Sequence, residues 1–259
     1  AYLARASGSK PFHRRAWGGS LSAACGHRTH NLVALRGDQS VGILPLTEIR
    51  SLLFGKSLVS SGFAVEGGPL FDDEAALAAL DDAAWDIARR AGIAVLEYRG
   101  PGRIHPQWQE KATTYAAFVR DIEAEVRKSL KLGLEVAIGR DGAALDEHYR
   151  IYATSVRNLG TPVFPRALFR EMLSRFGEDA DILTVRKDGE PVASVLSFYH
   201  DGTVYPYWGG GVFAARALRA NEHMYWMLME HARERGCTSF DFGRSKVGTG
   251  PYSYKKNWG

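Results

Sequence analysis

Leu183–Leu196 reads LTVRKDGEPVASVL, and far upstream Leu32–Pro45 reads LVALRGDQSVGILP. Each stretch begins with an apolar run, turns at an adjacent glycine and acidic residue, and restarts with Val-Gly or Val-Ala, which is typical of a β-hairpin. Each is followed by more strand, a helix, and a strand after a helix-ending glycine. We interpret this as two copies of one α+β unit, with chance similarity of two hairpins as the alternative.

The first copy predicts a helix at Glu74–Ala91, because apolar residues recur there at helical spacing, Asp72 or Asp73 can cap it and Gly92 can end it. Its predicted strands are Asn31–Arg36, Val41–Leu46, Leu58–Ser60 and Ile93–Tyr98.

Gly100-Pro101-Gly102, followed by polar residues to about Thr113, is the clearest linker in the chain. We therefore predict two domains, residues 1–112 and 113–259. In the second, the predicted strands are Thr114–Val119, Leu134–Ile138, Ile182–Arg186, Pro191–Tyr199, Val204–Trp208 and Ser239–Phe242. The predicted helices are Ile122–Leu132, Ala144–Asn158, Pro165–Phe176 and Asn221–Arg235.

The charge of the chain is concentrated at one end. The 259 residues carry 33 Lys and Arg against 29 Asp and Glu, a net charge of +4. Arg244–Gly259 holds four basic residues and no acid, so the other 243 residues balance at 29 of each. This argues against a general polyanion binder, and against a DNA partner, but leaves one cationic site near the C-terminus.

The composition, 45% hydrophobic and 24% charged, is that of a soluble globular protein. No apolar run is long enough to span a bilayer, and the first residues lack the pattern of an export signal. Cys25 and Cys237 are too far apart in sequence for a local metal knuckle, which favours free thiols in a reducing compartment. We expect a cytoplasmic protein, with peripheral contact at the inner face of the membrane left open.

Phe240–Gly259, FDFGRSKVGTGPYSYKKNWG, is the densest candidate site. We expect a strand to end at Phe242, a loop rich in glycine, hydroxyls and cations to follow, and an aromatic and basic strand to come next. Such a loop suits a phosphate or an oxyanion, and a surface hairpin is the alternative. Asp241 ends the core strand as either a functional or a buried structural acid.

Other candidates have equally plain structural explanations. Arg127 and Lys128 lie on a helix whose charges already suit the helix dipole. Tyr205–Gly211 either walls a ligand groove or forms a packed aromatic edge followed by a loop. Asn221 can simply cap a helix, and Tyr225 can simply be core. The eight histidines show no metal spacing, and His27-x-x-His30 has no carboxylate nearby in sequence, so we predict no metal site.

Phe240–Gly259 resembles the C-terminal signature of FemAB-related proteins, in the branch associated with bacterial exosortase (PEP-CTERM) and exopolysaccharide systems. The resemblance extends over most of the chain. It includes Phe12–Gly26, Gly42–Leu46, Leu53–Ser57, Gly67–Leu70, Val126–Lys128, Gly133–Val136, Leu159–Val163 and Asn221–Trp226.

The resemblance implies an α+β (mixed α/β) fold of two tandem GNAT-like acyltransferase domains, each a mostly antiparallel sheet flanked by helices. It also implies transfer of an acyl or aminoacyl group to an amine of a cell-envelope or exopolysaccharide precursor. The acceptor is then a small-molecule or glycan-linked amine, and the donor is a charged tRNA or acyl-CoA, with no permanently bound cofactor.

The matching positions imply roles for particular residues. Asp241, Lys255 and Lys256 are the expected catalytic residues: the lysines contact the donor and stabilise an oxyanion, and Asp241 orients the amine or takes its proton. The expected substrate-binding residues are Arg127, Lys128, Tyr207, Trp208, Asn221, Tyr225, Arg244, Ser245, Tyr254 and Trp258.

The sequence departs from ordinary GNAT enzymes at one functional motif. Their CoA-pyrophosphate loop is not recognisable, and Gly209–Arg219 is the one nearby candidate for it. An acetyl-CoA-dependent N-acetyltransferase is therefore the alternative enzyme. A non-catalytic protein that binds a glycan or a partner on the same fold is the alternative from another class.

Overall fold

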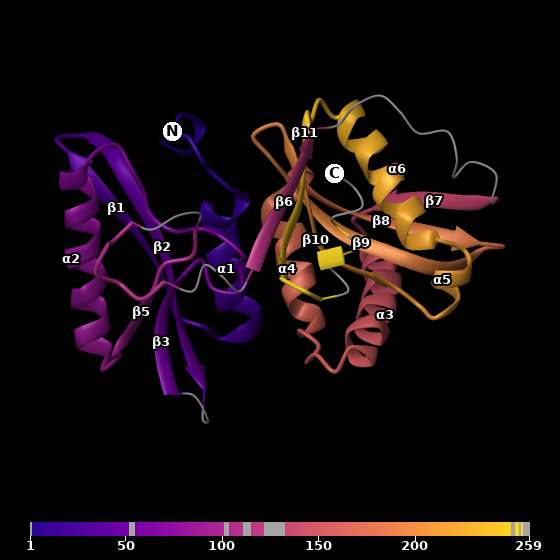
Figure 1. Ribbon diagram of the computed structural model, residues 1–259, viewed down its shortest axis with the longest axis horizontal. Helices are drawn as coiled ribbons and strands as arrows, with labels where there is room; N and C mark the ends of the chain where they lie inside the picture. Colours follow the sequence, from indigo (N-terminus) through magenta and orange to yellow (C-terminus); the bar gives the residue numbers. More distant parts are fainter. Residues whose placement is uncertain are drawn as a thin grey trace. The chain divides into compact units, whose positions relative to one another are not determined.

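The structure is a computed structural model that describes residues 2–51, 55–100, 104–110, 115–121, 133–249, 252, 253 and 255. For residues 115–121 and 246 it describes the backbone alone. The chain divides into two units, Ala1–Glu110 and Lys111–Gly259, and each is a mixed α/β arrangement of a sheet and helices (Figure 1).

Unit 1 is built around a mostly antiparallel sheet of order β1-β2-β3-β5, with β4 paired to β2. Helix α2 covers one face of this sheet and α1 the other (Figure 1). Its elements are α1 (Arg15–Cys25), β1 (Thr29–Arg36), β2 (Gln39–Ser51), β3 (Gly55–Ser60), β4 (Leu70–Phe71), α2 (Glu74–Ala91) and β5 (Val95–Glu97), preceded by 3-10 turns at Tyr2–Ala4 and Pro11–His13.

Helix α2 has the bounds that the sequence predicts. Asp73 accepts a hydrogen bond of 3.0 Å from the Ala76 amide, and Gly92 ends the helix with a φ of 61°. Its buried residues, Ala76, Leu77, Leu80, Ala84 and Ala88, form one stripe against the sheet. Helix α1 was not predicted, because its buried residues are few and its Gly18-Gly19 pair has low helix propensity.

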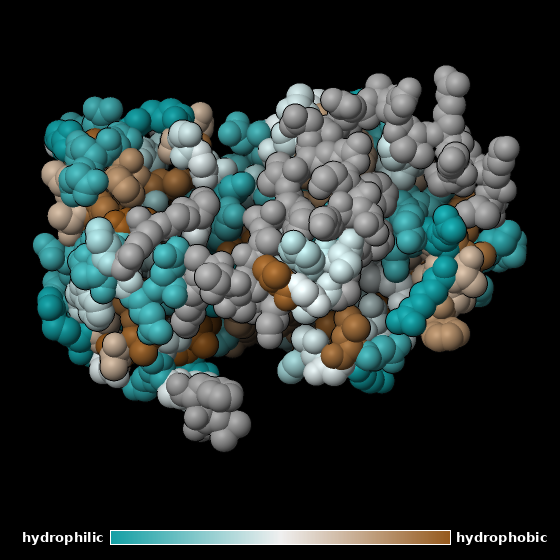
Figure 2. Space-filling model, viewed as in Figure 1, coloured by the Kyte–Doolittle hydropathy of each residue, from teal (hydrophilic) through white to brown (hydrophobic). Residues whose placement is uncertain are grey.

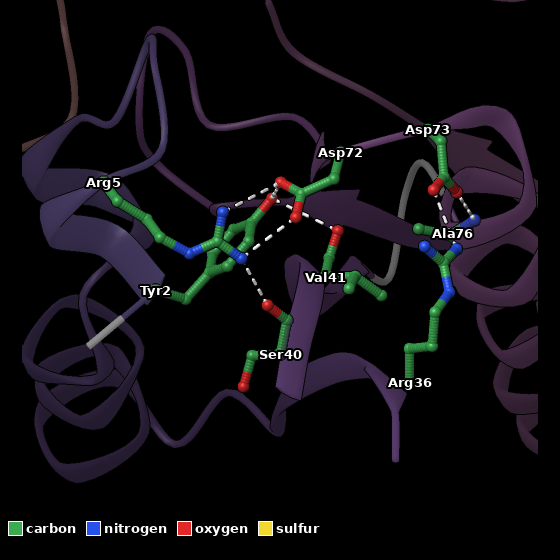
Figure 3. A network of polar contacts seen from close by, with 8 residues as sticks. All are labelled: Tyr2, Arg5, Arg36, Ser40, Val41, Asp72, Asp73 and Ala76. Atoms are coloured by element: carbon green, nitrogen blue, oxygen red, sulfur yellow. Dashed lines mark hydrogen bonds and ion pairs between the residues drawn. The ribbon is translucent and has the colours of Figure 1, made fainter. Parts of the chain in front are cut away.

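A polar network attaches the N-terminal turn to this sheet (Figure 3). The Arg5 guanidinium donates to the Ser40 carbonyl at 2.6 Å and to the Asp72 carboxylate at 2.9 Å, and the Tyr2 hydroxyl donates to Asp72 at 3.0 Å. The hydrogen bond from Arg5 holds the pKa of Asp72 below its usual value, whereas burial and Asp72 raise the pKa of Tyr2 to about 12.

Unit 2 is built around a six-stranded sheet of order β6-β11-β10-β9-β8-β7, antiparallel except between β10 and β11. Helices α3 and α4 lie on one face and α5 and α6 on the other (Figure 1). Its elements are β6 (Tyr115–Asp121), β7 (Leu134–Gly139), α3 (Gly142–Asn158), α4 (Arg166–Phe176), β8 (Ala180–Lys187), β9 (Glu190–His200), β10 (Thr203–Gly211), α5 (Ala214–Ala217), α6 (Ala220–Glu234) and β11 (Ser239–Lys246), with a 3-10 turn at Gly177–Asp179.

The two units share a topology. In each, three antiparallel strands (β1-β2-β3 or β8-β9-β10) lead through a helix (α2 or α6) to a strand that pairs parallel to the third. The hairpins predicted from LVALRGDQSVGILP and LTVRKDGEPVASVL are the first two strands of each unit. The duplicated α+β unit predicted from the sequence therefore agrees with the sheet order.

Three predictions in the second half are wrong in detail. Gly209–Gly211 is not a loop but the end of β10, and β11 continues past Phe242 to Lys246. The predicted aromatic and basic strand after the glycine loop is contradicted at Tyr252, Ser253 and Lys255, which have helical backbone. The predicted helix at Ile122–Leu132 lies outside the described residues.

No helix among the described residues combines the length and the apolar character needed to cross a bilayer. On the face seen in Figure 2, hydrophilic residues are interspersed with apolar ones.

Candidate functional site

The central feature of unit 2 is a fork between its two parallel strands. β10 and β11 pair only at Thr203 with Ser239 and at Val204 with Phe240. Beyond these pairs β10 continues along β9 and β11 continues along β6. We call the parts of the two strands beyond these pairs, Tyr205–Gly211 and Asp241–Lys246, the fork.

Both strands are irregular just where they part. β10 bulges between Pro206 and Trp208, and β11 bulges between Asp241 and Gly243. A bulge adds one residue to a strand, bends it and re-aims the side chains that follow. The bulges account for the separation of the two strands and set the direction of the candidate residues Tyr207, Trp208, Arg244 and Ser245.

Helix α6 packs on one face of the fork through aromatic residues. The Tyr225 ring lies 6.0 Å from that of Phe240 and 5.6 Å from that of Phe242. Burial raises the pKa of Tyr225 to about 12, so its hydroxyl stays protonated at neutral pH. Tyr225 thus lies beside the strand that carries Asp241, in contact with core residues.

On the other face, Trp208 is 6% exposed and packs against α4 and the segment before it. Its ring lies 5.2 Å from Phe169 and 6.1 Å from Phe164. Tyr207, half-buried, meets the Trp208 ring edge-on at 4.7 Å. Of these two candidates, Tyr207 has the more accessible side chain.

Asp241 and Lys255 are brought together at the β11 bulge. Asp241 is 7% exposed, and its carboxylate accepts a hydrogen bond of 2.7 Å from the Gly243 amide. The Lys255 ammonium donates to the Arg244 carbonyl at 3.2 Å and lies 4.0 Å from where a Cβ on Gly243 would stand. Burial lowers the pKa of Lys255 to about 8, while the negative charge of Asp241 opposes this shift.

The direction of Asp241 follows from strand alternation. Phe240 and Phe242 both pack toward α6, and successive side chains of a strand point to opposite faces. Asp241 therefore points to the same face as Trp208. A carboxylate and an ammonium of lowered pKa meet at this place.

The remaining described candidates are more dispersed. Ser245 is buried and Arg244 is exposed, both on β11 beyond the bulge. Asn221 lies in the first turn of α6, where its Oδ1 atom is buried and has no hydrogen-bond partner among the described residues. That atom lies 2.9 Å from where a Cβ on Gly211 would stand, so it faces the far end of β10.

Five predicted site residues lie outside the described residues: Arg127, Lys128, Tyr254, Lys256 and Trp258.

Sequence reasoning missed the partner of His30. The structure places His30 Nε2 3.0 Å from a carboxylate oxygen of Glu48, a residue distant from His30 in the sequence. Periodicity along β2 would not reveal this contact, because the antiparallel register between β1 and β2 creates it. Within the described ranges, no group of three or more His, Cys, Asp or Glu side chains is arranged to hold a metal ion.

The model of the acetyltransferase (GNAT) domain matches residues 116–256, more than half of the chain and nearly all of unit 2. The chain belongs to the GNAT acetyltransferase family. It is a transferase of the acyltransferase kind, and this GNAT member carries the fork inside the matched region.

Solved structures extend the likeness of this GNAT protein to its whole length. FemX is similar over 99% of this chain and 90% of its own, with 14% identity and a TM-score of 0.77. The C-terminal domain of a putative lysylphosphatidylglycerol synthetase from Agrobacterium fabrum is similar over 94% and 79%, with 16% identity and a TM-score of 0.54. A tandem GNAT protein from the clavulanic acid biosynthesis pathway is similar over 89% and 78%, with 11% identity and a TM-score of 0.53.

At these identities the likeness shows a shared fold of two GNAT-like units. Among curated proteins, none matches the sequence.

Proposed function

We propose that this chain transfers an acyl or aminoacyl group from an activated donor to an amine on a cell-envelope or exopolysaccharide precursor, as Fem-type enzymes do. The observation that supports this most is the pairing of Asp241 with Lys255 at the opening of the fork. Both residues lie inside the GNAT match and within the segment that resembles the FemAB signature.

The reaction forms a C–N bond and breaks the C–O bond of an ester or the C–S bond of a thioester. When the amine attacks the carbonyl, the carbonyl oxygen becomes an oxyanion, and a donor aimed at that oxygen lowers the barrier. We assign this role to the Lys255 ammonium, and its hydrogen bond to the Arg244 carbonyl at the fork supports the assignment. Asp241 orients the amine or takes its proton, and the leaving oxygen or sulfur receives a proton as the intermediate collapses.

Positioning supplies much of the remaining acceleration. Tyr207 lies half-buried against the Trp208 ring, and we assign it to contact with the donor or acceptor. Holding two reactants in a reactive geometry is worth about 7–11 kcal/mol of the barrier in well-oriented systems. Arg244, exposed on β11, is the described cation that we propose for a phosphate of donor or acceptor.

The proposed donor is either an aminoacyl-tRNA or an acyl-CoA. The GNAT match favours acyl-CoA, and the resemblance to FemAB-related proteins favours the charged tRNA. Gly209–Arg219, the one candidate for a pyrophosphate loop, contains the end of β10 and the short helix α5, whose turn is closed by its own backbone hydrogen bonds. Titration with CoA by calorimetry separates the donors: heat of binding supports acyl-CoA, and its absence supports the tRNA donor.

An acyl-transfer assay tests the site. Lys255→Ala is expected to lower kcat by about 100-fold, the loss typical of one oxyanion donor, with little change in KM. Lys187→Ala, at the end of β8 where the side chain pairs with Asp188, is the matched control and is expected to leave the rate unchanged. Lys256→Ala tests the second predicted lysine. If the Lys255→Ala and Lys256→Ala variants both keep full activity, the assigned site is wrong. If the native chain is inactive with both donors, a non-catalytic binding role is favoured.

A further inference from the structure

A second cluster of charged side chains lies in unit 1, around Glu48. This residue is 1% exposed, yet its carboxylate lies 3.0 Å from His30 Nε2 and accepts a hydrogen bond of 2.8 Å from Arg50. Arg28 Nε is 3.8 Å from the same carboxylate. Burial alone would raise the pKa of Glu48, but the hydrogen bonds from Arg50 and His30 outweigh it and hold the pKa below its usual value.

The strand register fixes where this cluster lies. Glu48 is opposite Leu58 on β3, and His30 is opposite Leu46 on β2. Leu46 and Leu58 belong to the core that packs under α2. Side chains opposite one another share a face, so the cluster lies on the α2 face of the sheet, where the core gives way to solvent.

The cluster carries more positive charge than its one carboxylate balances. Arg50 and Lys56 are direct cross-strand partners between β2 and β3, and like charges in that position destabilise a sheet. With Arg28 there are three permanent cations against Glu48, before either histidine is counted. Among the described residues, Lys56 forms no ion pair with an acidic side chain.

The donors of this cluster are both oriented and accessible. The side chains of Arg28 and Arg50 are 70% and 60% exposed, so most of their N–H groups face water. Glu48 fixes the direction of Arg50 and His30, and His27 Nδ1 lies 3.2 Å from the Glu48 carbonyl, which attaches the loop bearing Arg28. A buried carboxylate adds little net stability of its own, but it pre-organises the cations around it.

We propose that Arg28, His30, Arg50 and Lys56 form a phosphate-binding site on unit 1. Guanidinium groups match the geometry of phosphate oxygens through paired, charge-assisted hydrogen bonds, and an added dianion would relieve the repulsion between Arg50 and Lys56. The ligand is a phosphate or diphosphate group, carried either by a free small molecule or by a lipid headgroup. This proposal uses no residue of the fork and does not depend on the reaction proposed there.

Titration of the full chain with inorganic pyrophosphate by calorimetry tests the site. The triple variant Arg28→Gln, Arg50→Gln, Lys56→Gln is expected to bind about tenfold more weakly or worse, since it removes several charge-assisted hydrogen bonds. The double variant Arg28→Gln, Lys56→Gln keeps the hydrogen bond between Arg50 and Glu48, so it is expected to fold as the native chain does. Its loss of affinity for pyrophosphate is expected to be smaller than that of the triple variant.

The matched control is Arg36→Gln, Arg175→Gln, Arg233→Gln, which removes the same charge from exposed arginines already paired with carboxylates. We expect it to bind pyrophosphate as the native chain does. A second arm measures sedimentation with vesicles of phosphatidylglycerol and of phosphatidylcholine.

If the site variants, but not the control, lose binding of pyrophosphate and keep binding of phosphatidylglycerol, the ligand is a free phosphate. If they lose binding of phosphatidylglycerol and keep binding of pyrophosphate, the ligand is a lipid headgroup. Equal weakening in site and control variants overturns the proposal, because the attraction would then be general. Undiminished binding in both site variants, or no binding of either probe by the native chain, overturns it as well.

Discussion

At the scale of single residues, the proposed transfer reaction depends on the charge of Lys255. Burial lowers its pKa to about 8, and the nearby Asp241 carboxylate keeps it from falling further. A lysine in this range is cationic at neutral pH and becomes neutral in mildly alkaline solution. If the cation stabilises an oxyanion, the transfer rate depends directly on this titration.

We therefore expect kcat/KM to fall as the pH rises through about 8. Lys255→Arg keeps a cation that does not titrate in this range, so its alkaline limb is expected to move to higher pH even if its maximum is lower. Lys187→Arg is the control and should leave the profile unchanged. An alkaline limb that stays in place in Lys255→Arg would assign the titration to another group.

Asp241→Asn tests the coupling between the two groups. Removing the negative charge removes the effect that raises the pKa of Lys255, so this lysine should lose its proton at lower pH. We expect the alkaline limb of kcat/KM to shift toward neutral pH, with a lower maximum. A limb that does not move would show that the two side chains do not interact, and a limb that moves upward would contradict the expected sign of the interaction.

At the scale of elements, the glycines of β10 let helices approach the strand closely. A Cβ at Gly210 would lie 2.6 Å from the Cβ of Ser155 on α3, and one at Gly211 would lie 2.6 Å from the Cβ of Ala215 on α5. The sequence allows these glycines either to wall a ligand groove or to form a loop. In the structure they form strand, and the groups that approach them are side chains of the flanking helices.

Gly210→Ala is expected to lower the free energy of unfolding by about 1–3 kcal/mol, because α3 must move away from β10. Chemical denaturation measures this change. Gly142→Ala, at the start of α3, is the control: a Cβ there meets nothing within 4 Å, and alanine is the better helix former. A Gly210→Ala protein as stable as the native chain would show that α3 packs less closely than described.

The sequence predicts elements whose signals are local and misses those that depend on pairing. Helix α2 could be predicted to the residue, because its cap, its apolar stripe and its terminal glycine are all contained in Asp73–Gly92. The fork could not, because the separation of β10 from β11 depends on strands joined through α6 and on two bulges. Asp241 and Lys255 both belong to Phe240–Gly259, the segment that the sequence singles out. Their proximity in space comes from the chain turning back after β11, which the hydrogen bond from Lys255 to the Arg244 carbonyl shows.

At the scale of the whole molecule, the charge distribution limits contact with a nucleic acid. The excess of four positive charges lies in Arg244–Gly259, and the rest of the chain is balanced. A donor tRNA held by those four cations alone would release few counterions. Steep dependence on salt would require contacts over a much larger basic surface.

For a charged tRNA we expect the logarithm of the binding constant to fall against the logarithm of salt concentration with a slope of about −3 to −4. Fluorescence anisotropy at several salt concentrations measures this slope. A slope of about −6 or steeper would mean that contacts extend well beyond the C-terminal cations.

The short seam between β10 and β11 has a consequence for how unit 2 opens. Two residue pairs join the β6–β11 ribbon to the four-stranded ribbon β7–β10, whereas the other neighbouring strands pair over most of their length. Amide protons of β11 should therefore exchange with deuterium as one cooperative group, at a lower opening free energy than those of β9. In this respect unit 2 consists of two ribbons that are expected to separate at a lower free energy than the one needed to unfold either of them.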